Sequence, residues 1–302
     1  MEQIRNFDML IAQAKTKGAA GLAVVCPHDA DTVSAVKDGI NSGLVKPELF
    51  GDTEKINSLL EETQISKSDV AIVDAKDISE AIRGAIESIK IGRNKVLMKG
   101  SISTPEIMKP VMDKANGLNT GSLLSHIIVL EIPDFGRLLL STDGAINIAP
   151  TLDEKTLIVR NAIGVAKKLG IEVPKVAILA AVENINTKMQ ATIDAACLSK
   201  MADRGVFKGA LVDGPLSIDN ILSAGAAKKK GLGSEVAGAA DIVVSPFIEV
   251  ANVFSKTLNY MAGSTNAGIV VGAKAPIILP SRASSDKSKW ASLALGVLIA
   301  NQ

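Results

Sequence analysis

Aromatic residues are scarce in this chain: they supply only 3% of its 302 residues, although hydrophobic residues make up 47%. A sizeable core must therefore be built from Ala, Val, Ile and Leu, a composition that suits parallel strands covered by helices. The length is sufficient for two lobes or for one large domain.

An excess of either charge is also missing, because 33 Lys and Arg residues balance 32 Asp and Glu residues and leave a net charge of +1. This balance argues against nucleic acid or an anionic membrane as a partner, and any anion site must be local. No apolar run approaches the ~20 residues of a membrane-spanning helix. The N-terminal stretch has an amphipathic helical pattern rather than that of a signal peptide. We therefore expect a cytoplasmic protein.

Cysteine and histidine are too few for most metal or thiol chemistry, with only Cys26, Cys197, His28 and His126 in the chain. Cys26 lies in an apolar strand-like run and Cys197 in a helical pattern, which predicts two reduced core thiols. Cys26 and His28 occupy alternate positions of one run and do not form a nucleophile–base pair. A structural zinc site is not expected, and we predict no metal ligands.

Hydrophobic patterning predicts alternating strands and helices in the first half of the chain. The strand runs are 21–26, 49–51, 70–73 and 95–98, and the helical patterns are 31–43, 54–62, 78–91 and 104–115. This alternation is typical of a parallel sheet with covering helices. The pattern changes at 127–132 and 137–141, two apolar runs around the residues PDFG that predict an antiparallel hairpin.

Strand–helix alternation then resumes to the end of the chain. It predicts helices at 152–169, 186–203, 218–229, 250–261 and 288–300, and strands at 176–181, 209–212, 242–244, 268–272 and 276–279. The last helix carries an apolar face that includes Trp290, Leu293 and Val297. The fold class is therefore α/β, and the pattern change near Pro133 is the best indication of a boundary between two lobes.

Two predicted strand ends carry groups suited to anions, and a third carries a carboxylate. Arg282 stands among serines just after the apolar run 275–280, where a guanidinium fork and hydroxyls favour anion capture. Lys99 and Gly100 end a strand before Thr104 opens a helix, the outline of a phosphate-binding turn. Asp213 precedes Gly214-Pro215, which we expect to stop its strand. Arg282 could equally be a surface arginine, and the serines could serve as helix caps.

Seven sequence words occur in a specific order: LMKGSIST, STDGAINIAPTLDEK, PKVAILAAVENIN, LSKMADRG, VDGPLSID, SEVAGAADIVV and LPSRASSD. Together they resemble the phosphate acetyl/butyryl transferase family, with the closest likeness to its butyryltransferases. The resemblance implies a two-lobed fold like that of isocitrate and isopropylmalate dehydrogenases. It implies a discontinuous first lobe of residues 1–133 and 268–302, and a second lobe of residues 134–267.

The resemblance also implies a reaction: the reversible transfer of a short acyl group, butyryl or acetyl, between coenzyme A and inorganic phosphate. Coenzyme A is then a substrate, no tightly bound cofactor is expected, and the family implies a homo-oligomer. The implied catalytic residues are Ser281, Arg282, Ser285 and Asp286. The implied substrate-binding residues are Lys99, Gly100, Ser103, Thr104, Ser125, Asp143 and Asp213.

Two other readings stay open. A metal- and NAD-dependent dehydrogenase could share this fold, but no GxGxxG follows a predicted strand. The second alternative is a non-catalytic relative that binds acyl-CoA or phosphate. It stays open because Ser288 stands where acetyltransferases have an Asp six residues after the arginine. Asp286 lies two residues earlier and could replace that base or only cap the helix. Asp143 and Asp213 could likewise serve only to shape turns.

Overall fold

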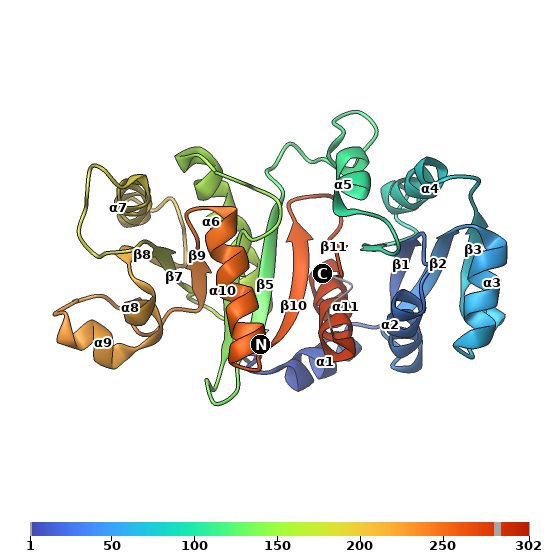
Figure 1. Ribbon diagram of the computed structural model, residues 1–302, viewed down its shortest axis with the longest axis horizontal. Helices are drawn as coiled ribbons and strands as arrows, with labels where there is room; N and C mark the ends of the chain where they lie inside the picture. Colours follow the sequence, from blue (N-terminus) through green and yellow to red (C-terminus); the bar gives the residue numbers. More distant parts are fainter. Residues whose placement is uncertain (1, 281–284, 302) are drawn as a thin grey trace. The chain divides into compact units, whose positions relative to one another are not determined.

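The computed structural model describes residues 2–280 and 285–301, and the chain divides into two compact units (Figure 1). One unit contains residues 7–122 and 267–302 and is called the N/C unit. The other contains residues 1–6 and 123–266 and is called the middle unit. The change of sequence pattern near Pro133 placed the expected lobe boundary between the two predicted hairpin strands. Here both strands belong to the middle unit, because they pair with each other along their length.

The N/C unit is built on strands in the order β3-β2-β1-β4-β11-β10. Neighbouring strands are parallel except for β10, which runs antiparallel to β11. The strands are β1 (Ala20–Val25), β2 (Val45–Gly51), β3 (Ala71–Asp74), β4 (Val96–Lys99), β10 (Thr265–Val271) and β11 (Ile277–Ile278). The helices are α1 (Phe7–Thr16), α2 (Ala30–Asn41), α3 (Thr53–Glu62), α4 (Ile78–Lys90), α5 (Thr104–Met112) and α11 (Asp286–Ala300), with a short 3₁₀ turn at Lys67–Asp69.

Helix α11 is the central helix of this unit. The sequence predicted one apolar face, but the structure also buries residues on its other sides, including Ser292, Leu295 and Gly296. Helices α1 and α2 both pack against α11, which accounts for burial all round. A helix that is covered on every side needs small or apolar residues throughout its length, and α11 has them from Ala291 onward.

The middle unit contains strands in the order β5-β6-β9-β7-β8. The predicted hairpin is confirmed: β5 (Ser125–Glu131) and β6 (Leu138–Thr142) are antiparallel, and the other neighbours are parallel. The remaining strands are β7 (Lys175–Leu179), β8 (Leu211–Leu216) and β9 (Ile242–Val244). The helices are α6 (Leu152–Lys168), α7 (Gln190–Asp203), α8 (Ile218–Leu222), α9 (Ala224–Lys229) and α10 (Ile248–Met261).

The predicted α/β fold, with mostly parallel strands and one antiparallel hairpin, is therefore confirmed, but two elements differ from the sequence prediction. Strand β8 continues through Gly214-Pro215 to Leu216 instead of ending before them. It lies at the edge of its sheet, where a proline without an N–H is tolerated, and a register shift in β7 accompanies it. The helix predicted over 218–229 is broken at Ser223, whose side chain caps α9.

Candidate functional site

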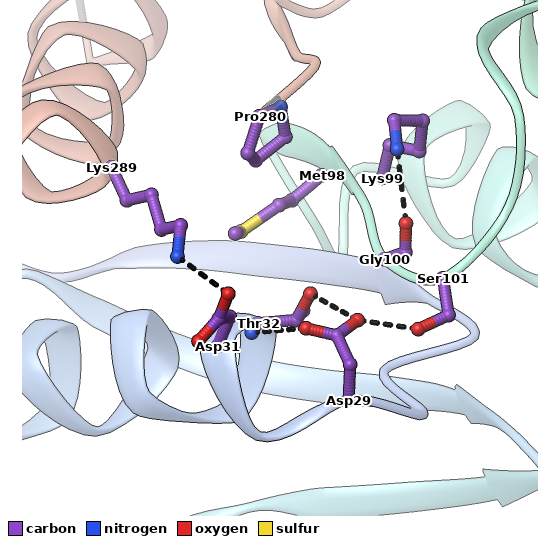
Figure 2. Close-up of a pocket in the computed structure, with 9 residues that line it drawn as sticks. All are labelled: Asp29, Asp31, Thr32, Met98, Lys99, Gly100, Ser101, Pro280 and Lys289. Carbon is purple, nitrogen blue, oxygen red and sulfur yellow. Dashed lines mark hydrogen bonds and ion pairs between the residues drawn. The ribbon is translucent and has the colours of Figure 1, made fainter. Parts of the chain in front are cut away.

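A cavity of about 250 Å³ opens in the N/C unit at the carboxyl ends of β1, β4 and β11 (Figure 2). Ligands of open α/β sheets bind at this end of the strands, because the loops there are free to vary. The cavity is lined by Asp29, Asp31, Thr32, Met98, Lys99, Gly100, Ser101, Pro280 and Lys289.

The turn after β4 forms one wall of the cavity. Gly100 is required there, since a Cβ at this position would lie 2.3 Å from the Cys26 carbonyl oxygen. Lys99 is buried, and its Nζ donates to the carbonyl oxygens of Gly100 at 3.1 Å and Ile102 at 2.9 Å. The ammonium group thus stabilises the turn from inside. Lys99 and Gly100 are the two predicted substrate-binding residues that line the cavity.

Asp29, the N-cap of α2, lines the cavity next to this turn. Its carboxylate accepts hydrogen bonds from the Thr32 N–H at 2.7 Å, from Thr32 Oγ1 at 2.8 Å, and from Ser101 Oγ. Burial alone would raise the pKa of Asp29, but the hydrogen bonds from Ser101 and Thr32 hold the pKa below its ordinary value. Asp29 is therefore an ionised carboxylate that joins α2 to the β4 turn.

Lys289 reaches the cavity from the first turns of α11. Its side chain is only 5% exposed, and its Nζ lies 3.3 Å from Asp31 Oδ2 and 3.7 Å from Asp286 Oδ1. Both carboxylates are on the surface, with side chains 64% and 81% exposed. Figure 2 shows the Lys289 ammonium pointing towards the Asp31 carboxylate.

The predicted catalytic group is only partly covered by the structure. Ser281 and Arg282 lie outside the described residues. Ser285 is the N-cap of α11, and its Oγ accepts from the Ser288 N–H at 3.3 Å. Asp286 is the first residue of α11 and is not among the residues that line the cavity. Ser288, which the resemblance places at the position of an acetyltransferase Asp, is buried in the same turn.

The predicted residues after the β4 turn cap a helix. Ser103 is the N-cap of α5 and forms a reciprocal capping box with Glu106, and Thr104 is the first residue of that helix. Neither side chain is among those that line the cavity. The capping box at Ser103 therefore fixes where α5 begins.

The other three predicted residues lie in the middle unit. Ser125 is fully buried and accepts from Asn161 Nδ2 at 2.9 Å. Asp213 Oδ1 accepts from the Gly214 N–H at 2.8 Å and from Ser199 Oγ at 3.3 Å. Both side chains are thus engaged within the unit.

Asp143, directly after β6, is the most heavily bonded of the three. Its Oδ1 accepts from the N–H groups of Ala145 and Ile146 at 2.9 and 3.0 Å. Its Oδ2 accepts from Asn147 Nδ2 at 2.6 Å and from the His126 N–H at 3.2 Å. The carboxylate organises the turn between β6 and α6, as an Asx side chain does.

Asp29, Asp31 and Lys289 line the cavity but were not among the site residues predicted from the sequence. Asp29 carried a usable signal, since it follows the apolar run 21–26 just as Asp143 follows β6. Lys289 carried a weaker one, as a lysine at the start of the most apolar helix of the chain. Nothing in the sequence brings residues 29 and 289 together.

Cys26 is buried and is not among the residues that line the cavity. Burial raises the pKa of the Cys26 thiol to about 11, with Glu106 as a smaller cause, so it is protonated at neutral pH. Within residues 2–280 and 285–301, no three His, Cys, Asp or Glu side chains are grouped as metal ligands. In the same part of the chain, no helix is both long and apolar enough to cross a membrane.

A family model described as "Phosphate acetyl/butaryl transferase" matches residues 75–297 of this chain. The phosphate butyryltransferase of Clostridium acetobutylicum is 43% identical over 297 residues, which cover 98% of this chain and 99% of that protein. The chain belongs to the phosphate acetyl/butyryl transferase family. Its resemblance to the family, inferred from seven sequence words, is confirmed.

Other relatives bear on the acyl group and on the fold. The phosphate acetyltransferase of Thermotoga maritima is 41% identical and covers 97% of this chain and 99% of its own length. A branched-chain phosphotransacylase from Enterococcus faecalis superposes with a TM-score of 0.82 at 30% identity, over 94% of this chain and 100% of that one. A 4-hydroxythreonine-4-phosphate dehydrogenase from Klebsiella pneumoniae, at 13% identity and a TM-score of 0.56 over 94% of this chain and 98% of that one, shares the fold alone.

Proposed function

We propose that this chain is a phosphate acyltransferase that moves a short acyl group reversibly between coenzyme A and inorganic phosphate. The observation that carries the proposal is near-complete alignment with enzymes named for this reaction at 41–43% identity. The cavity at the carboxyl ends of β1, β4 and β11 supports it, because this is where a small anion would meet backbone turns and a lysine.

The reaction needs no protein nucleophile. A phosphate oxygen attacks the thioester carbonyl carbon, a new C–O bond forms, and the C–S bond breaks. Coenzyme A leaves as a thiolate and takes up the proton that phosphate gives up. No tightly bound cofactor is required in this scheme, because coenzyme A is itself a substrate. Orientation of two bound reactants can contribute about 7–11 kcal/mol to such a step.

In this proposal Arg282 clamps phosphate through its planar fork, which matches phosphate oxygens better than a lysine does. Ser281 and Ser285 donate to phosphate or to the acyl oxygen as negative charge develops there. Asp286 exchanges the proton of the coenzyme A thiol, whose pKa resembles the ~8.5 of cysteine. The exposed position of Asp286 on α11 leaves it open to solvent and compatible with proton exchange.

Substrate contacts are proposed in each unit. In the N/C unit, Lys99 and Gly100 form the cavity wall, and Ser103 and Thr104 open the helix that follows it. In the middle unit the proposed contacts are Ser125, Asp143 and Asp213. Because the described partners of these three side chains already fix turns and strand ends, we assign them the positioning of backbone groups around the substrate.

Butyryl is the acyl group we favour, and acetyl is the alternative. Relatives named phosphate butyryltransferase are 43% and 40% identical, and one named phosphate acetyltransferase is 41% identical. The test is release of free thiol from butyryl-CoA and from acetyl-CoA, each with and without phosphate. Faster phosphate-dependent release from butyryl-CoA supports the proposal in full. Faster release from acetyl-CoA would change the acyl group, and phosphate-independent rates with both would overturn the function.

We further propose a cytoplasmic homo-oligomer. Both cysteines are free, which suits a reducing compartment. Helix α10 and the residue before it expose large apolar side chains, with Phe247 40%, Val253 64%, Tyr260 72% and Met261 84% exposed. Surfaces of this kind commonly mark protein–protein contacts. Light scattering after chromatography should show an oligomer, and Val253→Glu should reduce its mass to that of the monomer.

A further inference from the structure

Lys289 is unusual among the charged groups of the N/C unit because the cation is buried and its carboxylate partners are not. Lysines are almost never fully buried unless they are paired. Lys289 is 5% exposed, yet its ion-pair partners among the described residues are Asp31 and Asp286, which are 64% and 81% exposed. Lys289 and Asp31 both line the cavity, and the Asp31 side chain is open to solvent.

A buried lysine in the middle unit shows what a purely structural pair looks like. Lys155 is 3% exposed, and its Nζ lies 2.6 Å from Asp194 Oδ2, whose side chain is 8% exposed. The other Asp194 oxygen accepts from Gln190 Nε2 at 2.8 Å. Both charges are enclosed, at short distance, with the remaining acceptor satisfied. Lys289 has longer contacts and exposed partners, so an incoming anion can replace Asp31 without leaving a buried carboxylate unpaired.

The surroundings of Lys289 suit a small anion. The cavity of about 250 Å³ is too small for coenzyme A but has room for a phosphate ion. Asp29, the other carboxylate of the lining, already accepts hydrogen bonds from Ser101 and Thr32. Lys99 directs its ammonium to the carbonyl groups of Gly100 and Ile102. Among the lining cations, Lys289 is therefore the one whose described partner can be exchanged.

We infer that Lys289 binds inorganic phosphate in this cavity, and that Asp31 holds the ammonium group only while phosphate is absent. The inference rests on the proposed function and names a binding residue beyond those the sequence predicted. Substitutions of Lys289 and of Asp31 should therefore change phosphate binding in opposite directions. Removing the lysine charge should weaken phosphate binding, whereas removing the Asp31 charge should strengthen it by eliminating an internal competitor.

The test is steady-state kinetics of phosphate-dependent thiol release, with phosphate varied at saturating acyl-CoA and the reverse. Lys289→Met should raise the KM for phosphate roughly tenfold or more, as loss of a charge-assisted hydrogen bond does, and leave the KM for acyl-CoA unchanged. Lys289→Arg should restore part of the loss. Asp31→Asn should lower the KM for phosphate by about two- to fivefold, in the range of an exposed ion pair.

Controls separate this role from a structural one. Lys46→Met removes one positive charge at an exposed position of β2 outside the cavity lining and should leave both KM values unchanged. If Lys289→Met fails to fold, the phosphate KM values of Lys289→Arg and Asp31→Asn still test the inference. Asp31→Asn should fold because Asp31 is exposed. Unchanged phosphate KM in Lys289→Met, or a raised one in Asp31→Asn, would overturn the inference alone. Absence of phosphate-dependent release in the unmodified protein would overturn the proposed function and this inference together.

Discussion

Lys155 of the middle unit and Lys289 of the N/C unit are both buried beside aspartates, and they differ in how those aspartates are placed. Asp194 is enclosed with Lys155, whereas Asp31 is on the surface at the mouth of a cavity. An enclosed pair cannot exchange its partner without leaving a charge in a low-dielectric environment. A pair with one exposed partner can exchange that partner for a ligand. A buried cation with an exposed carboxylate partner is therefore a better indication of a binding group than a pair in which both charges are buried.

The largest expected effect comes from breaking the enclosed pair. Asp194→Ala leaves Lys155 buried without a counter-charge and should lower the free energy of unfolding by about 3–5 kcal/mol. Urea denaturation followed by circular dichroism measures the change. The double variant Lys155→Met/Asp194→Leu should recover most of the loss. If Asp194→Ala were as stable as the unmodified protein, the Lys155–Asp194 pair would not be the structural pair with which Lys289 is contrasted.

A smaller loss of stability is expected at the turn after β6, where both carboxylate oxygens of Asp143 accept hydrogen bonds, as those of Asp194 do. Asp143→Ala removes the acceptor of the Ala145 and Ile146 N–H groups and of the N–H of the buried His126. We expect a loss of about 1–3 kcal/mol in the free energy of unfolding. Asp143→Asn, which keeps one carbonyl acceptor, is the matched control and should be affected less. Equal stability of the two variants would contradict the turn-forming role.

The smallest effects are expected from two aspartates with opposite pKa shifts, one in each unit. Hydrogen bonds hold the pKa of Asp29 below its ordinary value of 3.8, so its contribution is present above that pH and lost as pH falls through the lower, folded-state pKa. Burial raises the pKa of Asp241, so its contribution is present at low pH and lost as pH rises through the raised pKa.

Unfolding measured from about pH 3 to pH 8 should therefore separate the two groups. The difference between the unmodified protein and Asp29→Asn should shrink towards low pH. Asp241→Asn should become relatively more stable as pH rises, because it removes a charge that burial disfavours. Parallel pH profiles for both variants would show that neither carboxylate is perturbed by its surroundings.

Much of the fold could be predicted because it depends on local periodicity. Alternating apolar runs and helical patterns placed most strands and helices near their observed positions, and PDFG between two apolar runs located the hairpin. Errors occurred where a tertiary contact outweighs a local signal. Gly214-Pro215 reads as a strand end, yet β8 passes through it at a sheet edge that needs no donor from Pro215.

The candidate site was less accessible to sequence reasoning. Lys99 and Gly100 were found because a strand, a glycine and a helix start follow one another in the sequence. Ser103 and Ser285 were predicted as site residues too, but they are N-caps of α5 and α11 and are not among the residues that line the cavity. Asp29 and Lys289 were missed because their significance depends on a cavity formed by β1, β4 and β11, which no local window contains.

The sequence by itself determined the α/β class and the family, since periodic burial and ordered sequence words are properties of short segments. Only the tertiary structure decided which charged groups share a cavity and which enclose each other. Lys155 follows Glu154 and Lys289 follows Ser288, both in unremarkable helical stretches. What distinguishes them is the exposure of the carboxylate that each one meets, and that exposure is set by packing between elements far apart in the chain.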